Sequence, residues 1–258
     1  MKEFFLPDKI RKCILGMAYE QNKVGCSQAG VYKFFSGNKV LYLKVEPEFC
    51  GLETEYKNMQ WLQGKLPVPQ VIEWASERGS DYLLLSEVKG RMLIDGFYLK
   101  NPALTVSLLA KGIRLLQSVD IKNCPISNSL QKKLEEAGEN IRLDKVDMSD
   151  WEAGSSGFSS PQELLDYLKR NTPKDEELIF THGDYCLPNI FADNDCLTGF
   201  IDIGRGGAAD LWQDVALCLR SLWHNFNTRE YDDLLLAHIG IPMNEEKLNY
   251  YILLDELF

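Results

Sequence analysis

An acid and an amide lie five residues apart in the segment THGDYCLPNIF, residues 181–191. The acid is Asp184 and the amide is Asn189. A loop that turns back on itself can direct the carboxylate towards an acceptor hydroxyl and the amide oxygen towards a metal ion. A second acid, Asp202, follows in the segment GFIDIG. These hard oxygen groups are the base and the Mg²⁺ ligands that phosphoryl transfer requires.

Protein kinases use the same residue types at the same spacing, with a base Asp, an Asn five residues later and an Asp in a following D-F-G. His-Gly-Asp alone is equally compatible with a turn whose side chains only cap the main chain. The joint presence of Asn189 and of Ile201-Asp202-Ile203-Gly204 favours phosphoryl transfer. We expect His182 to brace the loop.

A phosphate-binding lysine is expected upstream, and Lys44 in LYLKVE is the candidate. Tyr42 and Lys44 share one face of a strand, because side chains alternate, so Lys44 could reach phosphates while Tyr42 lies against adenine. An isolated strand lysine is more often simply exposed. In the helical pattern at 51–63, however, Glu55 falls within the apolar stripe and Glu53 does not. A buried carboxylate requires a partner, so we predict a Lys44–Glu55 ion pair.

The turn GCSQAG, residues 25–30, precedes this strand and is a candidate cover for the phosphates. It lacks the G-x-G-x-x-G pattern, so its position in front of the lysine strand is its main support.

The order of predicted elements indicates an α+β protein with two lobes. The first third is rich in strands and carries one helix, whereas the chain after Gly90 is mostly helical with a hairpin turning at 193–195. We expect an N-terminal nucleotide-binding lobe at 1–88, ending in a hinge, and a C-terminal catalytic and acceptor-binding lobe at 89–258. Such architectures usually bind a ligand between the lobes.

The 258 residues carry a formal charge of −10, which argues against a nucleic-acid partner and suits a cationic one. The seven cysteines form no C-x-x-C pair, so neither a zinc site nor a disulfide framework is expected. No signal peptide is evident, and the longest aliphatic runs are too short to span a membrane. We therefore expect a cytoplasmic protein with reduced thiols and no membrane partner, either a monomer or a weak dimer.

Several segments together resemble the aminoglycoside 3′-phosphotransferases, which are antibiotic-resistance kinases with a protein-kinase-like fold. The resemblance runs from end to end and rests on CSQAGVYK, LYLKVE, WLQGKLPVP, LLLSEVKG, THGDYCLPNIF, GFIDIGRGGAADLWQD and YYILLDELF. HGDxxxxN with IDxGR also occurs in choline and macrolide kinases. The WLxGKLPVP stretch and the DELF ending point more narrowly to the aminoglycoside branch.

The resemblance implies an ATP- and Mg²⁺-dependent kinase that phosphorylates an aminoglycoside hydroxyl, expected to be the 3′-hydroxyl, and so confers resistance. Asp184 would be the catalytic base, and Asn189 and Asp202 would hold Mg²⁺. Lys44 would contact the α- and β-phosphates and pair with Glu55.

The remaining nucleotide contacts are also implied by the resemblance. Ser27 would lie in the loop over the phosphates, and Tyr42 would stack on adenine. Ser86 and Val88, in the hinge, would bond the adenine edge through their main chain. Arg205 would lie near the acceptor or the transferred phosphate.

Acidic groups near the C-terminus are candidates for binding the cationic acceptor. Asp255, Glu256 and the terminal carboxylate of Phe258 place anions at the end of a predicted helix, where they oppose the helix dipole. A bound polycation would offset this, although an exposed tail would tolerate it as well. Glu152 and Asp150 are further candidates.

Two features depart from the family pattern. The segment AGSSGFSSP, residues 153–161, is neutral where acids are expected, and His224 stands where a carboxylate is expected. Fewer acids should weaken or narrow the binding of amino sugars.

Four other protein classes are alternatives to an aminoglycoside kinase. The nearest is a kinase of another small alcohol, such as choline, homoserine or a macrolide. A catalytically inactive relative is disfavoured because every catalytic position is occupied. A serine hydrolase lacks the G-x-S-x-G elbow, and a Rossmann oxidoreductase lacks the full glycine fingerprint around Gly204.

Overall fold

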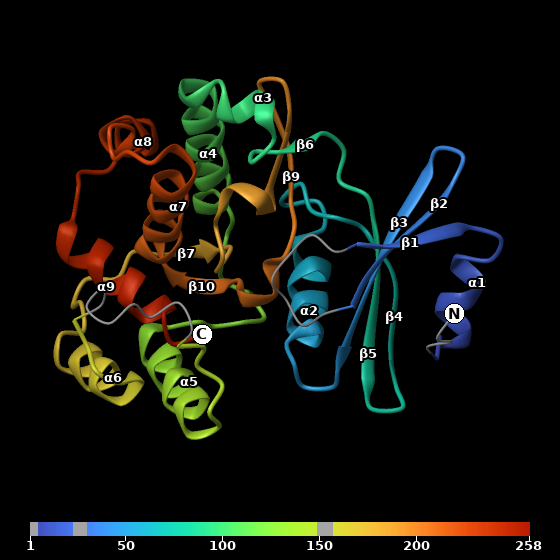
Figure 1. The fold of residues 1–258 in the computed structure, drawn as a ribbon, viewed down its shortest axis with the longest axis horizontal. Helices are drawn as coiled ribbons and strands as arrows, with labels where there is room; N and C mark the ends of the chain where they lie inside the picture. Colours follow the sequence, from blue (N-terminus) through green and yellow to red (C-terminus); the bar gives the residue numbers. More distant parts are fainter. Residues whose placement is uncertain (1–4, 23–29, 149–156) are drawn as a thin grey trace.

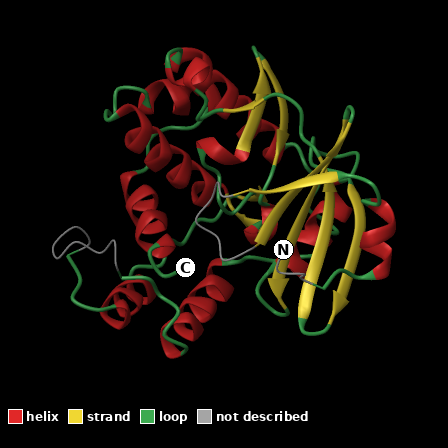
Figure 2. Ribbon diagram, turned by 45° about the vertical axis from the view of Figure 1, so that its right-hand side comes forward, coloured by secondary structure: helices red, strands yellow, loops and turns green. Residues whose placement is uncertain are grey.

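The computed structural model describes residues 5–22, 30–148 and 157–258. An antiparallel sheet with two flanking helices forms one half of the molecule, and a mainly helical body forms the other (Figure 1). Figure 2 shows the same division, with most strands gathered at one side and most helices at the other. The predicted two-lobed α+β architecture is confirmed. The exact lobe boundary at residues 88 and 89 remains a prediction.

The N-terminal half is built on a five-stranded sheet of order β1-β2-β3-β5-β4. Its strands are β1 (Ala18–Asn22), β2 (Gly30–Ser36), β3 (Lys39–Pro47), β4 (Val71–Glu77) and β5 (Ser80–Ser86). Helices α1 (Asp8–Cys13) and α2 (Leu52–Leu62) pack on opposite faces. The strand predicted to carry Tyr42 and Lys44 is thus β3, which forms a hairpin with β2, and the helix predicted at 51–63 is present as α2.

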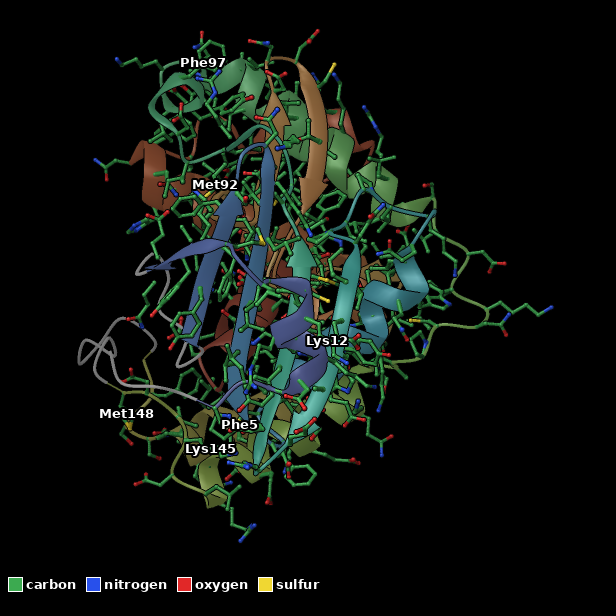
Figure 3. The ribbon with its side chains drawn as sticks, turned by 90° about the vertical axis from the view of Figure 1, so that its right-hand side faces the viewer. Phe5, Lys12, Met92, Phe97, Lys145 and Met148 are labelled. Atoms are coloured by element: carbon green, nitrogen blue, oxygen red, sulfur yellow. The ribbon has the colours of Figure 1, made fainter. Side chains whose placement is uncertain are left out.

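Side-chain alternation assigns the two faces of this sheet. Leu41 and Leu43 of β3 point into a small core under α1, and Figure 3 looks onto this outer face, where α1 lies across the sheet. Leu83 and Leu85 of β5 point the other way, into the main core shared with α2. Lys44 lies one residue after Leu43, so strand geometry directs its side chain to the face that carries α2.

The C-terminal half is mainly helical. Its helices are α3 (Gly96–Leu99), α4 (Pro102–Gln117), α5 (Leu130–Arg142), α6 (Pro161–Arg170), α7 (Leu211–Phe226), α8 (Asp232–Ile239) and α9 (Glu245–Asp255), with short 3₁₀ turns η1 (Leu187–Asn189) and η2 (Ile203–Arg205). Two small sheets complete it, one of β6 (Arg91–Met92), β8 (Ile190–Asp193) and β9 (Cys196–Phe200), the other of β7 (Leu178–Thr181) and β10 (Gly207–Asp210). Among the described helices, none is long and apolar enough to cross a membrane.

The central helix α4 supports the loop that follows β7. The Tyr185 hydroxyl donates a hydrogen bond of 2.7 Å to the carbonyl of Leu109. A Cβ at Gly112 would collide with this hydroxyl, so glycine is required where Tyr185 meets the helix. The fully buried Tyr185 therefore fixes the loop containing Asp184 onto the core.

The two halves are joined by main-chain contacts between the segment before β4 and strand β9. The N–H of Phe200 donates to the carbonyl of Pro67 at 2.9 Å. Val88 packs against Gly199, where a Cβ would come within 2.6 Å of a Val88 methyl. The hairpin that leads from Asn189 to Asp202 is thereby fastened to the N-terminal half.

The C-terminal tail differs from the exposed tail considered in the sequence analysis. Helix α9 ends at Asp255, and the following Leu257 is fully buried. Asn140 of α5 donates a hydrogen bond of 3.0 Å to the carbonyl of Leu257. The alternative of an exposed tail is therefore wrong, because the last residues pack between helices.

We expect Asp210→Ala to destabilise the helical body strongly. Asp210 is 1% exposed, caps α7 by accepting from Trp212 N–H at 3.2 Å, and accepts from Lys247 Nζ at 2.8 Å and from the Tyr251 hydroxyl at 3.0 Å. Its removal leaves a buried ammonium without its carboxylate, which should lower the free energy of unfolding by about 3–5 kcal/mol. Urea unfolding measures the change.

Glu139→Ala is the matched control, because Glu139 pairs with Arg142 on an exposed face of α5. It should change the free energy of unfolding by less than about 1 kcal/mol. An Asp210→Ala protein as stable as this control would contradict the assigned role of Asp210.

Candidate functional site

A buried carboxylate on α7 fixes the loop after β7 through hydrogen bonds to its main chain. Asp214 accepts hydrogen bonds from the N–H groups of His182 at 2.6 Å and Gly183 at 2.9 Å. Burial raises the pKa of Asp214 to about 7, although these two donors act in the opposite direction. Gly183 has φ +84°, and a Cβ there would collide with the carbonyl of Arg205. The sharp turn before Asp184 therefore needs both the glycine and Asp214.

His182 joins this loop to the end of β9. Its Nδ1 accepts from the N–H of Asp184 at 3.3 Å, so Nε2 carries the proton and donates to the carbonyl of Ile201 at 2.8 Å. Burial lowers the pKa of His182, which keeps the imidazole neutral and suited to accepting at one nitrogen and donating at the other. The His182 side chain thus bridges the main chain of Asp184 and that of Ile201, the residue before Asp202.

Asn189 lies against Asp184. Its Nδ2 donates to the Asp184 side chain at 2.9 Å and to the Asp184 carbonyl at 3.0 Å. The amide nitrogen is engaged, so the amide oxygen is the atom that Asn189 can offer to a cation. The Asn189 carbonyl accepts from Ile201 N–H at 3.0 Å, which brings Asn189 and Asp202 together.

Lys44 occupies the meeting point of the two halves. Its ammonium lies 2.7 and 2.9 Å from the two carboxylate oxygens of Glu55, so the predicted ion pair is present, and it also bonds the carboxylate of Asp202. Burial disfavours the charge on Lys44, but the two carboxylates outweigh burial and raise its pKa. Burial raises the pKa of Glu55, while Lys44 acts in the opposite direction. Lys44 therefore stays charged in the buried site.

The second predicted metal ligand, Asp202, lies directly before the 3₁₀ turn η2. Its main chain is in the left-handed region, with φ 58° and ψ 47°. Its side chain is 44% exposed, against 6% for that of Glu55. Asp202 is therefore the carboxylate of this cluster that faces the open side.

The donors fit Mg²⁺. Asp202 and Asn189 offer a carboxylate and an amide oxygen, which are hard ligands. No group of three or more His, Cys, Asp or Glu able to hold a metal occurs in residues 5–22, 30–148 and 157–258. Two protein ligands are what Mg²⁺ uses when phosphate oxygens and water complete its octahedron.

On the nucleotide side, Tyr42 shares the face of β3 with Lys44 and is partly buried, and burial raises its pKa. Ser86 ends β5, its N–H donates to the Gln70 carbonyl at 2.9 Å, and its hydroxyl accepts from Gln70 N–H at 2.9 Å. Val88 lies two residues after the end of β5. Ser27 is outside the described residues.

On the acceptor side, the predicted acids meet Arg205, but they are already paired. Asp255 lies 3.3 Å from Arg205 and also bonds Arg220, and Arg220 lies 3.3 Å from Glu256. Phe258 completes the group, with its ring 5.7 Å from the Arg205 guanidinium. The predicted residues Asp150 and Glu152 lie outside the described residues, and His224 is exposed on α7.

Several residues of the site were missed by the sequence analysis. Arg220 and Asp214 lie on α7, in the part of the chain that was predicted only to be mostly helical, and Asn58 lies on the inward stripe of α2. The sequence signal for a buried polar partner is a carboxylate or amide at an inward position among apolar residues. This signal was used only for Glu55. Lys133 offered no such signal, because lysine on a helix is normally solvated.

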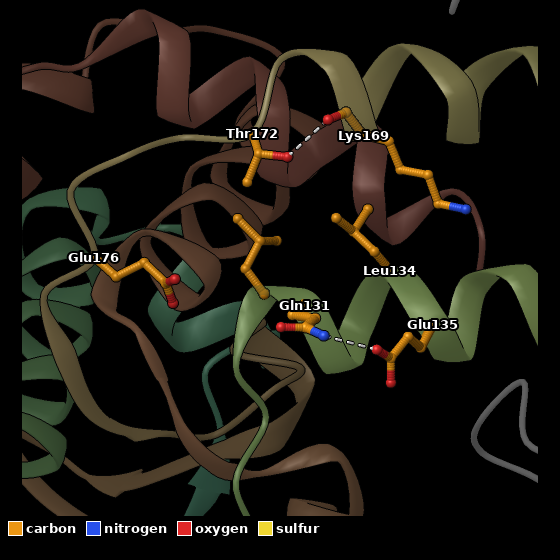
Figure 4. A pocket seen from close by; sticks show the side chains of 7 residues that line it. Gln131, Leu134, Glu135, Lys169, Thr172 and Glu176 are labelled. Carbon is orange, nitrogen blue, oxygen red and sulfur yellow. Dashed lines mark hydrogen bonds between the residues drawn. The ribbon is translucent and has the colours of Figure 1, made fainter.

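A separate cavity of about 400 Å³ opens between α5 and α6, where polar side chains surround a leucine floor (Figure 4). It is lined by Leu130, Gln131, Leu134, Glu135, Lys169, Thr172 and Glu176. None of the predicted site residues lines it, so it is not part of the cluster around Asp184.

Comparison with known proteins places the chain among phosphotransferases. Residues 32–247 match the phosphotransferase enzyme family. The chain is 39% identical to an aminoglycoside 3′-phosphotransferase of Enterococcus faecalis, with all of both chains covered. It is 40% identical to one of Niallia circulans, covering 92% of this chain and 91% of the relative.

Solved structures agree with the sequences. An aminoglycoside-3′-phosphotransferase of type VIII superposes with a TM-score of 0.85 at 33% identity, covering 96% of each chain. An aminoglycoside phosphotransferase of Streptomyces rimosus, solved with ADP and streptomycin, superposes with a TM-score of 0.80 at 25% identity, again over 96% of each chain.

We predict that Lys133→Met stabilises the protein at neutral pH. The Lys133 side chain is 7% exposed, and its ammonium lies 4.7 Å from the Phe258 ring. Burial, then Arg205, lowers the pKa of Lys133 from 10.5 to about 8, while Glu136 and Asp255 act in the opposite direction. At pH 7 the buried charge therefore disfavours folding, and its removal should raise the free energy of unfolding by about 1–3 kcal/mol.

The pH dependence tests the cause. Between pH 8 and 10.5 the native lysine is neutral while the unfolded one still binds a proton. The wild type therefore gains stability as pH rises through this window, and the advantage of Lys133→Met shrinks. Urea unfolding from pH 7 to 10 measures it, with the more exposed neighbour Lys132→Met as control. An advantage that stays constant with pH would contradict the account.

Proposed function

The chain belongs to the phosphotransferase enzyme family, in its aminoglycoside 3′-phosphotransferase branch, and we propose that it transfers the terminal phosphoryl group of ATP to the 3′-hydroxyl of an aminoglycoside antibiotic. The protein-kinase-like fold predicted from the sequence is that of its structural neighbours. Modification of the antibiotic confers resistance on the host.

The observation that carries this proposal is the arrangement of two bonded groups: the acid and amide Asp184 and Asn189, and a charged lysine bonded to two carboxylates. Asp184 and Asn189 are hydrogen-bonded at 2.9 Å, and Asp202 bonds the lysine that Glu55 holds at 2.7 Å. A base, two cation ligands and a phosphate-binding ammonium are the parts that phosphoryl transfer needs, because it depends on positioning and charge neutralisation.

Each side chain has a role in this reaction. Asp184 accepts the proton of the acceptor hydroxyl as the new oxygen–phosphorus bond forms and the bond from the γ-phosphorus to the bridging oxygen of the leaving ADP breaks. Asn189 holds the Asp184 carboxylate in place. Lys44, oriented by Glu55, contacts the α- and β-phosphates. Asn189 and Asp202 would hold Mg²⁺, which would supply positive charge to neutralise the phosphates.

The adenine is assigned to the end of β5. Tyr42 stacks on the ring, and the main chain of Ser86 and Val88 bonds its edge. The Ser86 N–H already donates to Gln70 at 2.9 Å, so Ser86 contributes its carbonyl, which leaves the donor role to Val88 N–H. Ser27 is assigned to the turn over the phosphates.

The acceptor is assigned to the acidic C-terminal tail. Asp255, Glu256 and the Phe258 carboxylate bind ammonium groups of the amino sugar, with Asp150 and Glu152 as further acids. Arg205 lies beside them and contacts the transferred phosphate. The arginines already bonded to Asp255 and Glu256 compete with the acceptor amines, so we expect a narrow substrate range. A cytoplasmic location and a monomer or weak dimer complete the proposal.

The substrate is tested by ADP release coupled to NADH oxidation, with Mg-ATP and a panel of acceptors. The panel contains kanamycin, neomycin, a 3′-deoxy aminoglycoside and choline. We expect turnover with kanamycin that is lost with the 3′-deoxy compound. Turnover with choline alone would reassign the acceptor to another small alcohol while keeping the chemistry.

We predict that Asp184→Asn lowers kcat by about 10²–10⁴-fold, because the amide cannot accept the hydroxyl proton. The side chain keeps its shape and an oxygen for Asn189, so thermal unfolding and ADP affinity should stay near those of the wild type. The coupled assay and calorimetry measure both. A variant with unaltered kcat would contradict the role of Asp184.

A further inference from the structure

Asn58 is a fully buried amide that connects the two halves of the molecule. It lies on α2, three residues after Glu55, and its Nδ2 donates to the carbonyls of Ile203 at 3.0 Å and Gly206 at 2.9 Å. Ile203 is the first residue of η2 and Gly206 is the residue that follows it. Asp202 lies directly before this turn. Residues three apart share one helix face, so one face of α2 directs Glu55 to Lys44 and Asn58 to the turn of Asp202.

The fold itself does not require these two hydrogen bonds. The carbonyl of Ile203 also accepts from Gly206 N–H at 3.1 Å, and the carbonyl of Gly206 also accepts from Asn128 Nδ2 at 3.1 Å. Both acceptors would thus keep a partner if Asn58 were removed. Within the described part of the chain, Asn58 Oδ1 is buried without a hydrogen-bond partner, which is unfavourable. An apolar side chain of similar volume would fill the position without that penalty.

We infer that Asn58 is a positioning residue for phosphoryl transfer, which sets the place of the Asp202 carboxylate relative to Lys44 and Asn189. The inference rests on the proposed function. Without the two hydrogen bonds, η2 is still folded by Asn128 and still packs on α2, but Asp202 is then linked to this helix through the Lys44 side chain and no longer through the main chain of the turn. The position of Asp202 is less strictly fixed, and a misplacement of about 1 Å is enough to lower a rate about a hundredfold.

The chain supplies a control with the same number of amide hydrogen bonds at the end of the same helix. Gln63 also donates from one amide nitrogen to two main-chain carbonyls, those of Met59 at 3.1 Å and Pro69 at 2.9 Å. Both acceptors precede β4 and belong to the N-terminal half. Gln63→Leu therefore removes the same number of amide hydrogen bonds without untying the two halves.

The test compares Asn58→Leu and Gln63→Leu with the wild type. ADP affinity is measured by calorimetry with and without Mg²⁺, and no acceptor is needed. For Asn58→Leu we expect the affinity for ADP alone to be unchanged. The factor by which Mg²⁺ increases the affinity for ADP should be smaller than in the wild type by about tenfold or more. Gln63→Leu should behave as the wild type. With the acceptor identified by the panel, kcat of Asn58→Leu should fall about 10- to 100-fold, with KM changed by less than about threefold.

Asn58→Asp provides a second variant of nearly identical shape, in which oxygens face the two carbonyls. It should lose at least as much of the Mg²⁺-dependent tightening as Asn58→Leu, even if the leucine packs poorly. A folded Asn58→Leu or Asn58→Asp protein whose ADP affinity increases with Mg²⁺ as much as that of the wild type would overturn the inference. An equal loss of ADP affinity with and without Mg²⁺, together with a lower unfolding midpoint, would show a merely structural role and also overturn it. Because the ADP measurements use no acceptor, a wrong acceptor assignment would leave them valid.

Discussion

A single buried ammonium, that of Lys44, controls how the two halves of this protein meet. Glu55 holds it from α2 at 2.7 Å, and Asp202 bonds it from the end of the β8–β9 hairpin. A charge with a side chain only 14% exposed is tolerated because two carboxylates compensate it. The strand, the helix and the hairpin must therefore keep fixed positions, or the buried ammonium of Lys44 loses one of the carboxylates that compensate it.

The surrounding structure supports this requirement from two directions. On the side of the helical half, Asp214 and His182 fix the loop of Asp184 and link it to Ile201, next to Asp202. On the side of the N-terminal half, Asn58 of α2 donates to the carbonyls of Ile203 and Gly206 in the turn after Asp202. The carboxylates of Asp184 and Asp202 thus lie on segments fixed by buried hydrogen bonds, and such preorganisation is what the proposed phosphoryl transfer would require.

The parts of the site that could be predicted from sequence are those whose geometry is local. The five-residue spacing of Asp184 and Asn189 forms one turn, and the position of Glu55 on the apolar stripe of α2 already implied a buried partner. Contacts between distant segments could not be predicted. Arg220 pairs with Asp255, 35 residues away, and this depends on how α7 packs on α9. Asp255 and Glu256 stay predictions as acceptor-binding acids, and their pairing with arginines was not predicted, because side-chain pairing follows from tertiary packing rather than from pattern.

The most direct test of the central role of Lys44 is the turnover of Lys44→Met at saturating Mg-ATP and acceptor. Methionine keeps the length of the side chain, and Glu55, whose pKa burial already raises, can bind a proton, so the variant should unfold cooperatively. The account predicts turnover below about one hundredth of the wild type, because the phosphate contact and the anchor of Asp202 are both lost. A folded Lys44→Met enzyme that turns over at the wild-type rate would contradict it.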